Sequence, residues 1–236
     1  MKLQHHDEFK KILASYSVSD RAKKTLAELK LVLMVAPSST GRNTMIRELL
    51  KTNKYKFIVS DTTRPPRVND GVPEQNGVEY WFRSEEEILD DLKSGEFLEA
   101  AVIHNQQVSG ISIRELEKAK NEAKIAITDI EVVGTDNVMH SKADAIAIFL
   151  LPPSFLEWQK RLNQRGKMSQ AEVNNRMNSA KKELEAALAH DYYQFVVADT
   201  LTRTVPLVDR IASGYKDKAE QQRGVQIAKE LLSELN

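Results

Sequence analysis

Residues 35–44, VAPSSTGRNT, combine small and polar residue types that could hold a phosphate group. A Walker A loop has the pattern G-x-x-x-x-G-K-[ST], and this chain keeps its second glycine as Gly41. Ala36, Arg42 and Asn43 replace the first glycine, the lysine and the Ser/Thr. A glycine turn at the start of a helix offers unpaired backbone N–H groups and the positive end of the helix dipole to an anion. The loop alone is therefore consistent with a modified phosphate site and with an ordinary strand-to-helix turn.

The substitutions change the chemistry expected of this loop. Arg42 keeps a positive charge, but a planar guanidinium does not replace a compact ammonium under the β- and γ-phosphates. Asn43 removes the hydroxyl expected to bind Mg²⁺, so its amide oxygen could serve only as a substitute ligand. We expect the loop to bind phosphate better than it positions the metal ion and the γ-phosphate.

A second stretch, residues 59–82, places two arginines three positions apart on a backbone restricted by prolines. Arg64 and Arg67 are the arginines, and Tyr80 follows after a glycine-containing segment. Such a rigid group of two cations and a phenolic donor suits a phosphate monoester. Surface ion pairing is the alternative for each arginine. As loop residues, both are expected to be dispensable for the fold.

These residues lie between apolar runs and helical patterns that alternate along the chain. The apolar runs have the length of β-strands and occupy residues 30–36, 57–62, 79–83, 96–104, 125–130, 144–151 and 193–199. Ser-x-x-Glu patterns at Ser84, Ser154 and Ser169 predict the starts of three helices. This alternation favours an α/β fold with a parallel sheet covered by helices on both faces. Ligands bind such sheets beyond the carboxyl ends of the strands, where the loop at residues 35–44 is expected.

The composition limits the classes of partner. Lys+Arg and Asp+Glu both number 34, so no net charge attracts the chain to nucleic acid or to an anionic membrane. There is no cysteine, which removes disulfides and thiolate chemistry. The longest apolar stretch, residues 145–153, is too short to span a bilayer, and the first residues do not resemble a signal peptide. We expect a soluble, cytoplasmic protein with no nucleic-acid or membrane partner.

Together, the motifs resemble those of the guanylate kinase family. Residues 36–44 resemble the family pattern G-P-S-G-x-G-K-S-T, and residues 60–67 with 79–80 resemble S-x-T-T-R-x-P-R followed by D/E-Y. Residues 95–99 are similar to G-E-F-x-E, and residues 129–134 to D-I-D-x-x-G. LPPS at 151–154, RLNQRG at 161–166, and Arg176 followed by AKKEL resemble the family's lid region. The resemblance covers residues 30–213, with the motifs in the same order.

The resemblance implies a P-loop nucleoside monophosphate kinase fold. It consists of a parallel sheet flanked by helices, a small mixed β-rich monophosphate-binding subdomain at about residues 60–112, and a helical lid with its adjoining long helix at about 154–188. Residues 30–213 form the kinase-like domain. Residues 1–29 and 214–236 are expected to be helical extensions that pack onto it.

The implied activity converts ATP and GMP to ADP and GDP with Mg²⁺ as cofactor. The ATP-binding residues would be Ala36, Pro37, Ser38, Ser39, Thr40, Gly41, Arg42, Asn43 and Thr44, and Mg²⁺ would be held by Asn43 or Thr44 with the phosphates. Arg161, Arg165 and Arg176 would close over the donor triphosphate and neutralise charge in the transition state. Arg42 and Asp129 complete the implied catalytic set.

The implied GMP-binding residues are Ser60, Arg64, Arg67, Tyr80, Glu99, Gly110, Ser112, Asp129 and Glu131. Arg64, Arg67 and Tyr80 would hold the acceptor phosphate in line with the γ-phosphate. Glu99 would accept hydrogen bonds from N1–H and the exocyclic amine of guanine, a pairing that adenine cannot make because its N1 is an acceptor. Asp129 would position the acceptor or order Mg²⁺-bound waters, and Glu131 stands where the family has a second aspartate.

Departures from the family pattern leave two functional hypotheses. Ala100, Ser109 and Ile111 stand where the family has an aromatic residue, a tyrosine and a Ser or Thr near the base. The first hypothesis is a guanylate kinase-like enzyme, slow or with relaxed base specificity, which the retained lid arginines favour. The second is a catalytically inactive module that binds a nucleotide or a protein partner, which the altered loop favours. We expect the enzyme.

Overall fold

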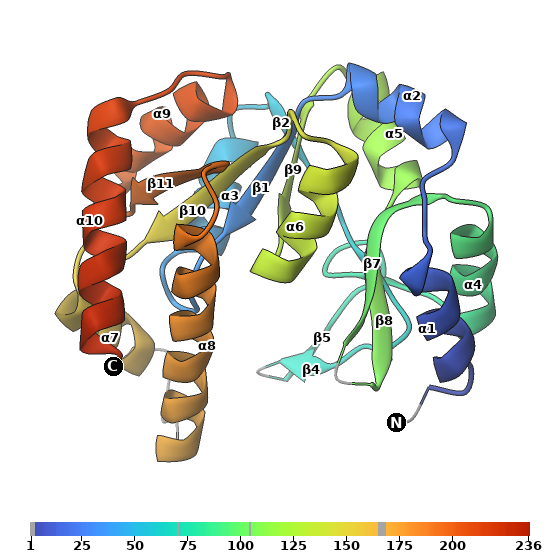
Figure 1. Cartoon of the computed structure of the whole chain (residues 1–236), viewed down its shortest axis with the longest axis horizontal. Helices are drawn as coiled ribbons and strands as arrows, with labels where there is room; N and C mark the ends of the chain where they lie inside the picture. The colour runs from blue at the N-terminus through green and yellow to red at the C-terminus, as the bar shows by residue number, and fades with distance from the viewer. Residues whose placement is uncertain (1–2, 70, 104, 165–168) are drawn as a thin grey trace. The chain divides into compact units, whose positions relative to one another are not determined.

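The computed structural model describes residues 3–69, 71–103, 105–164 and 169–236 (Figure 1). The chain divides into two compact units. The first unit comprises Met1–Lys30, Lys56–Ala126 and Asp136–Ala143, and the second comprises Leu31–Tyr55, Ile127–Thr135 and Asp144–Asn236. Among the described residues, no helix has the length and apolar character needed to cross a membrane.

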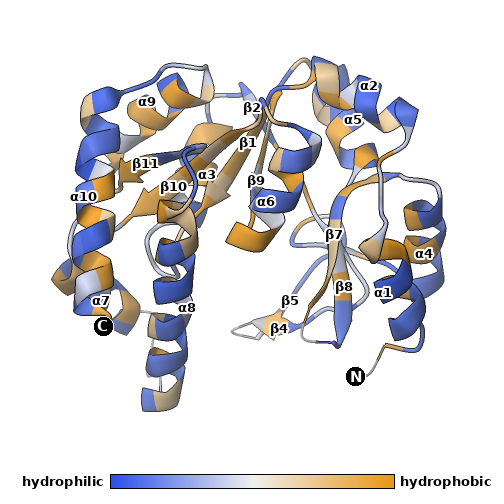
Figure 2. Ribbon diagram, viewed as in Figure 1, coloured by the Kyte–Doolittle hydropathy of each residue, from blue (hydrophilic) through white to orange (hydrophobic). Residues whose placement is uncertain are grey.

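One sheet has five strands in the order β11-β10-β1-β9-β2, of which β1, β10 and β11 lie wholly in the second unit. Its strands are β1 (Leu31–Val35), β2 (Tyr55–Phe57), β9 (Ile125–Asp129), β10 (Ile146–Leu151) and β11 (Tyr193–Val197). β1 pairs with β10, and β10 with β11, in parallel. Every residue of β1 is buried, as expected of a strand covered on both faces. Figure 2 shows β1 and β10 in the hydrophobic colours, whereas α9 and α10 carry both colours. The expected parallel sheet flanked by helices is confirmed.

The helices belonging wholly to the second unit are α3 (Arg42–Leu50), α7 (Phe155–Asn163), α8 (Gln170–Leu188), α9 (Leu201–Ala212) and α10 (Lys218–Glu234). A further helix, α6 (Val132–Ser141), begins in the second unit and ends in the first.

The C-terminal helix α10 covers the edge strand β11. Gln221 accepts a hydrogen bond from Phe195 N at 2.7 Å and donates one to Tyr193 O at 3.0 Å. Glu220 accepts from Val197 N at 2.8 Å. These side chains take the place of a neighbouring strand, so they prevent the open edge from pairing with another chain.

The first unit contains a mixed four-stranded sheet with the order β6-β3-β8-β7. Its strands are β3 (Asp61–Thr62), β6 (Trp81–Phe82), β7 (Phe97–Ile103) and β8 (Gln107–Ser112). β3 pairs with β6 in parallel and with β8 antiparallel, and β7 pairs with β8 antiparallel. A separate hairpin joins β4 (Val68–Asn69) to β5 (Val72–Pro73), and the helices are α1 (His6–Ala14), α2 (Asp20–Glu28), α4 (Glu85–Lys93) and α5 (Ile113–Asn121).

The N-terminal segment supplies part of the core of the first unit. Leu3 and Phe9 are buried in one cluster with Ile88, Leu89, Leu92, Phe97 and Val108. The hydroxyl of Tyr16 donates to Phe97 O at 2.6 Å. At Gly95, φ is 70° and an added Cβ would lie 2.7 Å from Ser19 N, so only glycine allows this segment to pack so closely. Residues 3–28 are therefore an integral layer of the unit.

The local signals differ from the structure in three places. The predicted strand 57–62 is divided between β2 and β3, which belong to different sheets, and the run 79–83 contributes only β6. β8 was not predicted, because QVSGIS lacks a continuous apolar pattern. Ser84 and Ser169 begin α4 and α8 with reciprocal capping boxes, whereas Ser154 caps α7 from one side only.

Candidate functional site

The loop between β1 and α3, residues 36–41, forms a concave backbone turn. Ser39 has φ 69° and Gly41 has φ 108°, so two residues of the loop adopt the left-handed conformation. Glycine at position 41 is suited to this conformation because it has no Cβ. Consecutive peptide N–H groups in such turns point to one side and form an anion-binding hollow. Gly41 is also the N-cap of α3, whose dipole adds to the attraction.

Two hydroxyl groups of the same loop have no hydrogen-bond partner among the described residues. They are Ser39 Oγ and Thr40 Oγ1, and both atoms are buried. A buried polar group without a partner costs about 1 to 3 kcal/mol. A pair of them in one turn therefore favours a site completed by a polar ligand over an ordinary strand-to-helix turn.

Arg42, at the lysine position of the motif, is bonded to the carboxyl end of β9. Its Nη2 donates to Asp129 Oδ2 at 2.9 Å, and its Nη1 lies 3.4 Å from Ile130 O. The side chain is 26% exposed and that of Asp129 is 36% exposed, so both remain accessible to a ligand. The structure brings these two predicted catalytic residues together, and their roles in catalysis remain predictions.

The carboxyl group of Glu183, which the sequence did not single out, interacts electrostatically with Arg42. Glu183 on α8 has a buried Oε2 without a hydrogen-bond partner among the described residues. Burial and the negative charge of Glu131 raise the pKa of Glu183 to about 7, and Arg42 acts in the opposite direction. The helical pattern of α8 gave no signal for it, because its charge partners are far away in the sequence.

Two predicted lid arginines contact residues 36–41 directly. Arg161 donates through Nη1 to Thr40 O at 3.0 Å and through Nη2 to Ala198 O at 3.1 Å. Arg176 Nη1 donates to Ser38 Oγ at 2.6 Å. Their positive charges therefore lie beside the loop, as a triphosphate site requires. The third predicted lid arginine, Arg165, lies outside the described residues.

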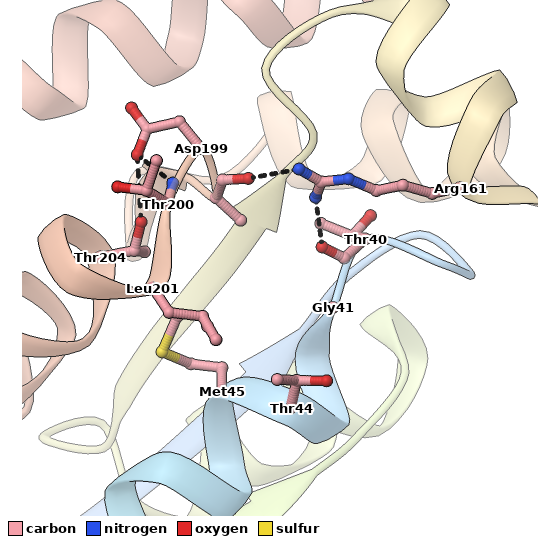
Figure 3. Close-up of a pocket in the computed structure, with 10 residues that line it drawn as sticks. Thr40, Gly41, Thr44, Met45, Arg161, Asp199, Thr200, Leu201 and Thr204 are labelled. Atoms are coloured by element: carbon pink, nitrogen blue, oxygen red, sulfur yellow. Dashed lines mark hydrogen bonds between the residues drawn. The ribbon is translucent and has the colours of Figure 1, made fainter.

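A pocket of about 230 Å³ opens beside this loop (Figure 3). Its lining consists of Thr40, Gly41, Thr44, Met45, Arg161, Ala198, Asp199, Thr200, Leu201 and Thr204. Figure 3 shows Arg161 bonded both to Thr40 and to the segment that follows β11. The lining combines the apolar side chains of Met45 and Leu201 with threonine hydroxyls, and this combination suits a flat heterocyclic base.

Sequence reasoning missed the part of this pocket formed by residues 198–204. The available signal was position alone, because these residues follow the carboxyl end of β11. Asp199 Oδ1 accepts from Thr200 N at 2.7 Å and lies 3.3 Å from Thr204 Oγ1. The carboxylate thus fixes the first turn of α9. We call this pocket together with residues 36–44 the donor site.

In the first unit, Arg64 forms a nearly buried ion pair with Glu74. Nη1 lies 2.5 Å from Glu74 Oε2 and Nη2 lies 3.0 Å from Oε1, and the side chains are 9% and 8% exposed. The guanidinium also lies over the ring of Tyr80, at 4.7 Å from its centroid. This pair argues against the expectation that Arg64 is dispensable for the fold, because removing the guanidinium would take away the cation that is ion-paired with a nearly buried carboxylate.

Arg67 differs from Arg64 in exposure. It is exposed, and its guanidinium has no ion-pair partner among the described residues. Its backbone exchanges two hydrogen bonds with Glu74. Arg64, Arg67 and Tyr80, which we call the phosphate clamp, therefore belong to one folded loop.

The predicted base-binding residues lie on β7 and β8. Glu99 is 9% exposed and pairs across the sheet with Ile111. Burial raises the pKa of Glu99 to about 8. Gly110 lies opposite Ala100, and an added Cβ would come within 2.7 Å of Ala100 Cβ, so this position requires glycine.

Ser112 is buried at the end of β8, and Ser60 precedes β3. The first unit contains seven of the predicted GMP-binding residues, which we call the acceptor site: Ser60, Arg64, Arg67, Tyr80, Glu99, Gly110 and Ser112. The remaining predicted GMP residues, Asp129 and Glu131, belong to the second unit.

The parallel sheet, the loop between β1 and α3 and the mixed β-rich unit define a P-loop nucleoside monophosphate kinase-like fold. The family model for guanylate kinase matches residues 28–214. The chain therefore belongs to the guanylate kinase family.

Individual proteins support this assignment. The chain is 37% identical over 176 residues to a guanylate kinase of Porphyromonas gingivalis, covering 73% of this chain and 91% of that protein. It is 38% identical over 158 residues to guanylate kinase 1 of Oryza sativa subsp. japonica, covering 66% of this chain and 40% of the rice protein. The crystal structure of guanylate kinase from Anaplasma phagocytophilum is similar with a TM-score of 0.57 and 26% identity, covering 87% of this chain and 94% of that chain.

Proposed function

We propose that this protein transfers the γ-phosphoryl group of ATP to GMP, forming ADP and GDP. Its curated relatives in P. gingivalis and O. sativa are named as guanylate kinases. The observation that carries the proposal is the loop at residues 36–41. It combines two left-handed residues, two buried hydroxyls without partners and contacts from two lid arginines. A cytoplasmic location, where both nucleotides are available, is part of the proposal.

The donor site would bind ATP. Backbone N–H groups of residues 36–44 would hold its phosphates, and the pocket lined by Met45 and Leu201 would hold its base. Arg161 and Arg176 would stabilise the charge that develops on the transferred group. Arg42 would have to act from its position beside Asp129, where its charge is partly neutralised.

The acceptor site would bind GMP. Arg67 and Tyr80 would contact its phosphate, with Arg64 as the more deeply buried cation. Glu99, in its ionised form, would accept from N1–H and the exocyclic amine of guanine. Ile111 offers no hydroxyl to the O6 of the base, so we expect discrimination between GMP and AMP to be weaker than in family members with Ser or Thr there.

The residues of α3 are compatible with a magnesium ion. Thr44 lines the donor pocket and Asn43 is exposed, and both carry oxygen ligands of the kind that Mg²⁺ binds. Among the described residues, no three acidic or histidine side chains are grouped to hold a metal alone. This suits an ion held mainly by nucleotide phosphates and water, which would neutralise the charge of the β- and γ-phosphates.

In the proposed reaction, an oxygen of the GMP phosphate attacks the γ-phosphorus of ATP. A new P–O bond forms as the bond to the bridging oxygen breaks, and ADP leaves with that electron pair. No protein side chain forms a covalent intermediate, since phosphoryl transfer depends mainly on alignment and charge stabilisation. The arginines and the loop provide both.

An ADP-release assay with ATP, Mg²⁺ and each of GMP, AMP, UMP and CMP tests the proposal. We expect the highest kcat/KM with GMP. Arg67→Ala should raise KM for GMP and leave KM for ATP unchanged. Arg210→Ala, an exposed arginine of α9 with 58% side-chain exposure, serves as the matched control and should change neither. A chain that binds GMP but releases no ADP with any acceptor would contradict the proposal and identify a non-catalytic module.

A further inference from the structure

Glu74 holds Arg64 by a bidentate ion pair, and this leaves part of the guanidinium available. Arginine has five N–H donors in a planar fork. Three of the hydrogen bonds of Arg64 are accounted for, two with Glu74 and one from Nη1 to Pro65 O at 3.0 Å. Neither Glu74 nor Pro65 uses the Nε–H or the second hydrogen of Nη2, and the side chain of Tyr80, the third member of the phosphate clamp, also interacts with the guanidinium. These two donors lie along one edge of the guanidinium and can engage two oxygens of one phosphate.

The same carboxylate also fixes the backbone of Arg67. Glu74 Oε2 accepts from Arg67 N at 2.8 Å, and Glu74 N donates to Arg67 O at 2.8 Å. Residues 67–74 are thereby closed into a loop that includes the β4–β5 hairpin. One side chain therefore sets both the orientation of Arg64 and the point from which the Arg67 side chain starts.

The rings below Arg64 complete this arrangement. The guanidinium carbon lies 4.7 Å from the centroid of Tyr80 and 5.5 Å from that of Phe82. Such cation–π contacts restrict the guanidinium plane. With the carboxylate at one end and the rings at its face, Arg64 has little freedom to turn.

We propose that Glu74 is a positioning residue of the acceptor site, which orients the free edge of Arg64 and the backbone of Arg67 for the phosphate of GMP. The inference rests on the proposed function, because it takes the clamp of Arg64, Arg67 and Tyr80 as the phosphate site. Glu74 itself does not touch the phosphate. It reduces the orientational freedom that the two arginines would otherwise lose on binding.

The competing interpretation is that Glu74 occupies the phosphate position and is displaced by GMP. Displacement would separate two charges that are 9% and 8% exposed. Breaking such a buried pair is strongly unfavourable. It would also break the bond to Arg67 N, which a phosphate at Arg64 would not replace. These costs favour a carboxylate that stays in place.

The two interpretations predict opposite signs for Glu74→Gln. Removing a negative charge near an anion by itself favours phosphate binding, so weaker binding in a folded variant indicates lost orientation once a control excludes general disturbance of the loop. We expect the Kd for GMP, measured by titration calorimetry, to rise about tenfold, as for the loss of one charge-assisted hydrogen bond. The Kd for guanosine, which has no phosphate, should stay unchanged. Tighter binding of GMP would overturn the proposal in favour of displacement.

Glu79→Gln is the matched control, since it removes the same charge from the same segment. Glu79 accepts from Gln75 N at 2.7 Å and contacts no arginine among the described residues. It should leave both dissociation constants unchanged. Loss of GMP affinity in both variants would assign the effect to general disturbance of the loop and overturn the positioning role. Circular dichroism and the midpoint of thermal unfolding verify that each variant is folded.

A double-mutant cycle separates positioning from mere structural support. In the Arg64→Ala background, Glu74→Gln should lower the affinity for GMP less than twofold, because Glu74 acts mainly by orienting Arg64. Full additivity would overturn the proposal. Glu74→Asp should restore part of the affinity lost in Glu74→Gln.

The binding measurements also separate this inference from the proposed function. If wild type prefers GMP over guanosine but does not release ADP, the phosphotransferase proposal fails while Glu74 can still be tested. If wild type turns over and Glu74→Gln binds GMP normally, only the positioning role fails.

Discussion

Replacing Glu99 with glutamine should stabilise the folded protein while removing its preference for guanine. Burial raises the pKa of Glu99 from its ordinary value of 4.5 to about 8. Both folded and unfolded states hold the proton below pH 4.5. As pH rises from there to 8, the unfolded state ionises first, so wild type loses stability. At about 1.4 kcal/mol per pH unit, the loss is on the order of 3 to 5 kcal/mol.

Denaturant unfolding at several pH values from 5 to 8.5 measures this effect. The free energy of unfolding of Glu99→Gln should exceed that of wild type by an amount that grows with pH and levels off near 8. Glu122→Gln is the control. That carboxylate is exposed and its pKa is lowered by Lys56 and Lys124, so its removal should give no gain at high pH. Parallel pH profiles for wild type and Glu99→Gln would refute the reasoning.

The same pKa has a consequence for ligand binding. Glu99 must be ionised to accept two hydrogen bonds from guanine, so GMP binding should release a proton at pH 7. The affinity for GMP should therefore rise with pH until about pH 8. Calorimetric titrations in buffers of different ionisation enthalpy measure the released proton. Binding without proton release, or a preference for GMP over AMP that survives in Glu99→Gln, would mean that another residue recognises the base.

Three further outcomes are expected. Arg67→Ala and Arg64→Ala should each reduce the preference for GMP over guanosine in calorimetry. Only Arg64→Ala should also lower the free energy of unfolding, by roughly 3 to 5 kcal/mol, since it removes the cation that is ion-paired with the nearly buried carboxylate of Glu74. Arg42→Lys combined with Asn43→Ser should raise the rate of phosphoryl transfer by about tenfold or more, and it should change the Kd for ATP by a smaller factor. A wild-type rate that is already on the order of 1 to 100 per second would contradict this prediction. Gln221→Ala should lower the free energy of unfolding by about 1 to 3 kcal/mol, because it removes the hydrogen bonds to Phe195 N and Tyr193 O of the edge strand. An unchanged denaturation midpoint would contradict this prediction.

Local patterns in the sequence predict β1, β9, β10 and β11 of the parallel sheet, the starts of three helices and the family. Residues 145–151 are apolar throughout, and a strand buried on both faces needs no more than that. Serine followed three residues later by glutamate satisfies helix N–H groups within one turn, so the signal is local. The motif at residues 60–67 has its informative residues within eight positions. Each of these features depends on neighbours in the chain.

The partners of the charged residues depend on contacts that the fold makes between distant parts of the chain. Arg42 meets Asp129, which is 87 residues away in the sequence, and Arg161 meets Ala198 across 37 residues. Glu99 and Glu183 have raised pKa values because of burial, which no local pattern reports. A guanidinium or carboxylate has the same composition in every context, but its charge, orientation and accessibility follow from the groups that the fold places around it. For that reason the sequence predicts Arg64 as a site residue, but only the fold shows that Glu74 holds it.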